Sequence, residues 1–155
     1  MNLAVPGYHI AMPDCKLIRT QNTFEGKQGF SYFEGISTES VGSHAVCMHL
    51  LEIPPGARAH VHLHEGHETA IYVLEGVAEM LYGDQLEHHM VCEAGCYVYI
   101  PAGVPHVPWN PSKDKFAKGV IARTDPNEQE SVVLCPHLEP IVEAFLAKQT
   151  SECPA

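Results

Sequence analysis

The sequence predicts an all-β fold that ends in one α-helix. Two observations favour strands. Twelve glycines and twelve prolines divide the 155 residues into short segments, and most of these segments are rich in β-branched and aromatic residues. A third observation marks the helix, because apolar residues near the C-terminus recur at three- and four-residue spacing. A chain of this length is the size of one domain, and we expect a single domain over residues 1–155.

The strands are expected from residue 30 onward, after a mixed N-terminal stretch. In that stretch we expect a short strand near residues 8–11 and a loop around 20–28. The later runs, four to ten residues long, have strand length. They lie at 30–37, 44–53, 58–64, 69–74, 77–82, 86–92, 97–100, 106–110 and 116–124. Gly83 and Asp84 fit a tight hairpin, since glycine tolerates the positive φ that such a turn requires.

The C-terminal helix is expected over about residues 138–149. Pro140 suits a first helical turn, where the missing N–H leaves no bond unmade. Five apolar residues recur at helical spacing, Leu138, Ile141, Val142, Phe145 and Leu146. The helix is therefore expected to cover a hydrophobic flank of the domain itself, and a partner-binding helix is the alternative.

Charge and composition argue against several partners and locations. The formal net charge is -10 with nine Lys and Arg, whereas binding nucleic acid or an anionic membrane needs clustered cations. The N-terminus lacks the pattern of a secretory signal, and no window approaches the roughly 18 apolar residues of a membrane span, so a cytoplasmic location is expected. The six cysteines form no CxxC pair and are expected to be buried or inert thiols.

Four of the eleven histidines lie within eight residues, at His60, His62, His64 and His67. Alternate side chains of a strand share one face, so the first three point the same way. Neutral imidazole is a common metal ligand, and two of them at i and i+2 converge without rearrangement of the backbone. The cluster therefore predicts a metal site. A third ligand is expected from His106, which a turn rich in proline and glycine places at the start of a later strand.

Both histidine segments resemble the two motifs of the cupin superfamily. The second motif, G-x5-P-x-G-x2-H-x3-N, is matched at Gly95, Pro101, Gly103, His106 and Asn110. The first, G-x5-H-x-H-x(3,4)-E-x6-G, fits at Gly56, His62, His64 and Gly76. The resemblance implies a cupin-type double-stranded β-helix, or jelly-roll barrel, with a core over about residues 30–125. It also implies one metal ion held inside the barrel by His62, His64 and His106.

The acidic ligand departs from this motif. Counting back from Gly76, Thr69 stands where cupins carry glutamate, and Glu68 lies one residue early. On a regular strand this shift turns Glu68 to the opposite face. Either a bulge at residues 65–67 returns Glu68 to the site as fourth ligand or general base, or three histidines hold the metal with water in the remaining positions. His60 and His67 are expected beside the site or at the surface.

The resemblance implies a mononuclear metalloenzyme with dioxygenase-like chemistry on a small organic acid or dicarbonyl compound. The expected metal is Fe(II) or Mn, with Ni or Zn as alternatives. Three neutral imidazoles do not reduce the charge of a divalent metal ion. Such a site therefore favours an anionic or enolisable ligand. A non-redox isomerase or lyase is one alternative, and a non-catalytic protein that binds a small ligand or metal is the other. A homodimer is expected, since related cupins commonly pair.

Overall fold

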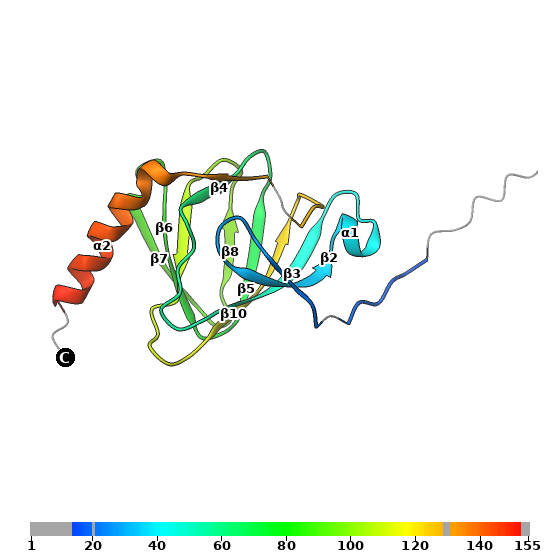
Figure 1. Cartoon of the computed structure of the whole chain (residues 1–155), viewed down its shortest axis with the longest axis horizontal. Coiled ribbons are helices and arrows are strands. Elements are labelled where there is room, and N and C mark those ends of the chain that lie inside the picture. The colour runs from blue at the N-terminus through cyan, green and yellow to red at the C-terminus, as the bar shows by residue number, and fades with distance from the viewer. Residues whose placement is uncertain (1–13, 20, 129–130, 153–155) are drawn as a thin grey trace, which may run out of the picture.

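Figure 1 shows the computed structural model, which describes residues 14–19, 21–128 and 131–152, as two antiparallel β-sheets with a helix beside one of them. The six-stranded sheet has the order β1 (Thr23–Glu25), β2 (Ser31–Ile36), β3 (Cys47–Ile53), β10 (Ala117–Arg123), β5 (Thr69–Glu75) and β8 (Tyr97–Ile100). The five-stranded sheet has the order β11 (Val132–Leu134), β4 (His62–His64), β9 (His106–Trp109), β6 (Val77–Tyr82) and β7 (His88–Glu93). The prediction of an all-β fold is confirmed.

One hydrophobic core lies between the two sheets. Where one face of a strand is inside the protein and the other is outside, successive side chains alternate between buried and exposed. Strand β3 follows this rule, since every second residue from Cys47 to Ile53 is buried. The buried residues of this core are Phe30, Tyr32, Leu51, Ile53, Ala59, Ala117 and Ile121. This alternation also decides which polar side chains enter the interior.

A second core lies between the five-stranded sheet and α2 (Glu139–Glu152), which follows a short 3-10 turn at Pro136–Leu138. Figure 1 shows α2 lying along the side of β6 and β7. Outward residues of the sheet meet the helix in one buried cluster of Val61, Leu81, Leu86, Val107, Trp109, Cys135, Leu138 and Val142. The helix therefore covers the domain's own flank, as predicted. None of the helices in the described part of the chain is long and apolar enough to span a membrane.

Some elements differ from the sequence prediction. Strands β6 and β8 have the predicted ends, but β4 is shorter than the predicted run at 58–64. The reason is that the backbone at Val61 bonds elsewhere: its N–H donates to Glu139 Oε1 (2.8 Å), and its carbonyl accepts from the N–H of Cys135. The predicted strand near residues 8–11 lies outside the described residues.

Three short elements have no counterpart in the prediction: β1, β11 and α1 (Thr38–Val41). Helix α1 depends on a capping box, in which the Ser37 hydroxyl accepts from the Ser40 N–H and the Ser40 hydroxyl accepts from the Ser37 N–H. The turn after β6 is also longer than a two-residue hairpin, since β7 starts only at His88 and Leu86 N–H bonds back to the Gly83 carbonyl.

Candidate metal centre

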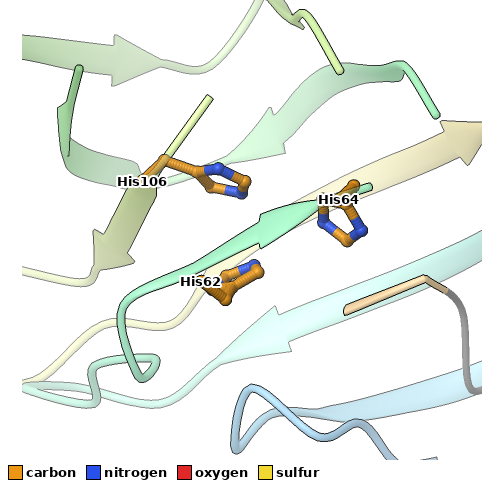
Figure 2. A group of neighbouring side chains, drawn as sticks. All are labelled: His62, His64 and His106. Carbon is orange, nitrogen blue, oxygen red and sulfur yellow. The ribbon is translucent and has the colours of Figure 1, made fainter. Parts of the chain in front are cut away.

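Two neighbouring strands bring the three predicted histidines together. His62 and His106 are directly opposite each other on β4 and β9, and His64 shares the inner face of β4. All three are buried, with 2–3% of their surface exposed. One ligand nitrogen from each lies within 4.8 Å of the others, and Figure 2 shows the rings turned toward a common space. The three side chains are therefore close enough that they could hold a metal ion.

Backbone carbonyls orient two of the rings. His62 Nδ1 lies 2.7 Å from the His60 carbonyl oxygen, and His106 Nδ1 lies 2.9 Å from the Val104 carbonyl oxygen. A carbonyl can only accept, so each Nδ1 carries the proton and donates it. Each Nε2 therefore holds a free lone pair, the arrangement found in histidines that bind metals.

The interior also keeps these imidazoles uncharged. Burial holds the pKa of His62 well below its usual range, and the neighbouring His106 lowers it further. Burial lowers the pKa of His64 to about 2, with the charge of Arg123 adding to the effect. Burial also lowers the pKa of His106 to about 4. Neutral imidazole is the form that binds a metal, so the three residues fit a metal ion.

Two of the histidines, His62 and His106, line an interior cavity of about 80 Å³. The polar and charged residues of its lining include His62, Thr69, Glu79, His106, Lys118 and Arg123. Most of the remaining lining is apolar and comes from both sheets, including Leu51, Ile53, Ile71, Val73, Val98, Ile100 and Ile121. A reactant in this cavity would be largely shielded from water, which strengthens electrostatic interactions within it.

Glu68 does not join the histidines. Strand β5 pairs in regular register from Thr69 onward, so Thr69 points inward and is 2% exposed. Glu68 lies on the outside, where its Oε1 accepts a hydrogen bond from the Tyr99 hydroxyl (2.6 Å) and its N–H donates to Thr124 Oγ1. Glu68 therefore lies on the face opposite Thr69, as expected for neighbouring residues of a regular strand.

His60 and His67 lie beside the three histidines without joining them. The side chain of His60 is 63% exposed, and its Nδ1 lies 3.8 Å from Glu139 Oε1. His67 Nδ1 lies 2.7 Å from Ser131 Oγ and 3.6 Å from Asp125 Oδ2. Within the described ranges, the one group of side chains placed to hold a metal is His62, His64 and His106.

Arg123 is the site residue that the sequence analysis missed. It ends the alternating inward row of β10, which begins at Ala117 and continues through Gly119 and Ile121. The side chain is 5% exposed, with its guanidinium carbon 5.7 Å from the centre of the Tyr32 ring. The sequence does contain a sign of this role: Arg123 falls at the inward position of a strand whose other inward residues are apolar. Charged residues are rarely buried in this way without a function or a partner.

Part of the chain, including the three histidines, is similar to a known protein family. Residues 49–118, which include all three histidines, match the family model of the cupin domain. The sequence matches no curated protein at a significant level.

Solved structures share the fold. A protein of Klebsiella pneumoniae with a double-stranded β-helix domain is 18% identical, with a TM-score of 0.53 over 61% of this chain and 73% of that one. A recombinant oxalate oxidase in complex with glycolate is 21% identical, with a TM-score of 0.55 over 64% of this chain and 52% of that one. An oxalate decarboxylase is also 21% identical, with a TM-score of 0.61 over 82% of this chain and 34% of that one.

The chain thus spans about half of the oxalate oxidase and a third of the oxalate decarboxylase. At these identities the likeness concerns the fold. The predicted jelly-roll architecture is confirmed by the double-stranded β-helix neighbours. Together with the family match around the histidines, the shared fold supports the predicted resemblance to the cupin superfamily.

Proposed function

We propose that this protein is a mononuclear metalloenzyme with dioxygenase-like activity on a small organic acid or dicarbonyl compound. The observation that carries the proposal is the group of three buried, uncharged imidazoles, two of which, His62 and His106, line an interior cavity. Three protein ligands leave coordination positions open, which is typical of catalytic rather than structural metal sites.

His62, His64 and His106 would hold the ion, with Fe(II) or Mn as the metal in this proposal. When bound, such an ion supplies Lewis acidity and the redox capacity for oxygen chemistry. The position of Glu68 outside the barrel supports a site of three histidines without a carboxylate. The chain's own contribution is to orient the imidazoles through the His60 and Val104 carbonyls and to exclude water through the apolar walls.

Small acids are the first compounds to test. The volume of about 80 Å³ is well below the several hundred Å³ of pockets for larger ligands. The fold is shared with an oxalate oxidase in complex with glycolate and with an oxalate decarboxylase. A panel of short hydroxy acids, keto acids and dicarbonyl compounds therefore covers the proposed substrate class.

The test compares metal content and substrate-dependent oxygen uptake of wild type and His62→Ala. Wild type should hold about one metal ion per chain and consume oxygen with one member of the panel, and His62→Ala should lose both. His60→Ala is the matched control, since its imidazole is exposed and should change neither. Metal content well under one equivalent in wild type would contradict the proposal.

The alternatives predict different results in the same assays. Equal activity with Zn and Fe would exclude oxygen chemistry, because zinc is redox-inactive, and would favour an isomerase or lyase. Tight binding of a panel member without product by mass spectrometry would favour a binding protein without turnover.

A further inference from the structure

Arg123 and Thr69 form a pair of donors in one layer of the barrel. They are direct partners across β10 and β5, and Cys47 of β3 is the partner of Arg123 on its other side. Arg123 and Thr69 are 5% and 2% exposed, and both line the cavity that His62 and His106 also line. A molecule in that cavity therefore meets the metal ligands on one sheet and these two donors on the other.

The Thr69 hydroxyl is the more informative of the two. Its Oγ1 is buried and has no hydrogen-bond partner among the residues that the structure describes. A buried hydroxyl without a partner loses the free energy of its bonds to water, so such groups are uncommon unless a ligand or water completes them. At the wall of the metal cavity, a bound ligand is the natural acceptor for its proton.

Arg123 supplies the charge. Its guanidinium stays protonated at any physiological pH and presents several N–H donors in one plane, a shape that matches a carboxylate. Its field reaches the three histidines, since its charge contributes to the lowered pKa of His62, His64 and His106. A ligand between Arg123 and the histidines therefore meets positive charge from the guanidinium as well as from a bound metal.

We infer that Arg123 and Thr69 bind the carboxylate of the substrate, and that the substrate is a short carboxylic acid with a second oxygen that reaches the metal. This inference rests on the proposed function, because the second oxygen needs the metal of the three histidines. A 2-hydroxy acid or 2-oxo acid meets both requirements in a cavity of about 80 Å³ with mostly apolar walls. A neutral dicarbonyl compound lacks the group that Arg123 recognises.

The test measures binding of glycolate and of its neutral methyl ester by calorimetry, using zinc-loaded protein so that turnover does not interfere. Wild type should bind glycolate at least tenfold more tightly than the ester. Arg123→Gln should weaken glycolate binding by about 10- to 100-fold, the usual range for loss of a charged hydrogen-bond partner. Thr69→Val should weaken it several-fold, and neither change should alter zinc content or binding of the ester.

Thr124→Val is the matched control. Thr124 is next to Arg123 in sequence, but its hydroxyl bonds Glu68 N–H on the exposed side of the sheet. It should bind glycolate as wild type does. If Arg123→Gln does not fold, Arg123→Lys and Thr69→Val still decide the matter, since both should weaken glycolate binding while leaving the ester unaffected.

Equal glycolate affinity in wild type and in folded Arg123 and Thr69 variants would overturn the inference, as would wild type that does not bind glycolate. Failure of the proposed function gives a different result. If wild type takes up no metal, the proposed function fails, while a loss of residual glycolate affinity in metal-free Arg123→Gln would still support the carboxylate site.

Discussion

The Tyr99 hydroxyl donates a hydrogen bond of 2.6 Å to Glu68 Oε1 on the outside of the six-stranded sheet. This bond joins the start of β5 to its neighbour β8 and keeps the carboxylate in solvent, away from the three histidines. The hydrogen bond also raises the pKa of Tyr99, because the neighbouring carboxylate stabilises the protonated phenol. Glu68 is therefore bound to a surface partner.

Replacement of Glu68 by alanine should leave the metal site intact. We expect about one metal ion per chain in Glu68→Ala, as in wild type, and little change in stability, because the lost hydrogen bond is exposed to solvent. Elemental analysis and urea unfolding measure both quantities. Loss of metal from folded Glu68→Ala would show that the carboxylate moves into the site when metal binds.

Thr69→Glu should strengthen metal binding. Thr69 faces the cavity beside His62 and His106, so a glutamate there would add a carboxylate to three imidazoles. Arg123, its direct partner on β10, would offset the cost of burying that charge. We expect at least a tenfold lower dissociation constant for Mn(II), measured by competition with a chelator. Thr69→Gln has similar size without the charge and should show a smaller gain.

Weaker Mn(II) binding by folded Thr69→Glu would contradict this geometry. It would mean that a side chain at position 69 cannot reach the space shared by the histidines.

The sequence predicted strands well where turn residues mark both ends. Strand β6 lies between Gly76 and Gly83, and β8 ends just before Pro101, so glycine and proline mark these ends. Strands β1 and β11 have three residues each, too few for alternation to be recognised. Strand β11 also forms by pairing with β4, which is far away in the sequence. The local sequence pattern holds no information about such a contact.

The three candidate metal ligands were predictable for two separate reasons. The i, i+2 spacing places His62 and His64 on one face of β4, which is a local property of the strand. His106 was expected from the Pro/Gly turn that precedes it, and the resemblance to cupin motifs linked it to His62 and His64. The sequence pattern of β10 could indicate that Arg123 points inward, but its place beside the histidines depends on the register of β10 with β5, where it lies opposite Thr69. Register between distant strands is a tertiary property.

His49 should make the metal-free protein less stable in acid. It is 2% exposed and packs edge-on against Phe24, with ring centres 5.0 Å apart. Burial lowers its pKa to about 4, and the charge of Arg123 adds to this effect. Between about pH 6.5 and pH 4 the unfolded chain therefore binds a proton that the folded chain does not, so stability falls as the pH decreases through this window.

The expected contribution of His49 is about 2 kcal/mol lost between pH 7 and pH 5. Urea unfolding of metal-free wild type and His49→Leu at both pH values measures it. The variant should lose about 2 kcal/mol less than wild type, and the remaining loss would come from the three buried histidines of the candidate metal centre. An identical loss in both proteins would mean that His49 is protonated in the folded state.

Two motif glycines with the same backbone conformation should respond differently to alanine. Gly76 and Gly103 have φ values of 76° and 77°, a region that costs residues with a Cβ about 1–2 kcal/mol. A Cβ on Gly76 would lie 2.5 Å from the carbonyl oxygen of Phe116, just before β10, whereas one on Gly103 would meet nothing within 4 Å. The free energy of unfolding of Gly103→Ala should therefore fall only by the cost of the backbone conformation, about 1–2 kcal/mol.

The free energy of unfolding of Gly76→Ala should fall by at least about 2 kcal/mol more than that of Gly103→Ala, because β5 and β10 must separate or distort to admit the methyl group. Urea unfolding of the two variants under one set of conditions gives the difference directly, and their shared φ makes each the control for the other. Equal losses would mean that the chain at Phe116 moves aside at little cost. Because β10 carries Arg123, a loss of glycolate binding in folded Gly76→Ala but not in Gly103→Ala would indicate that this spacing positions the cavity wall.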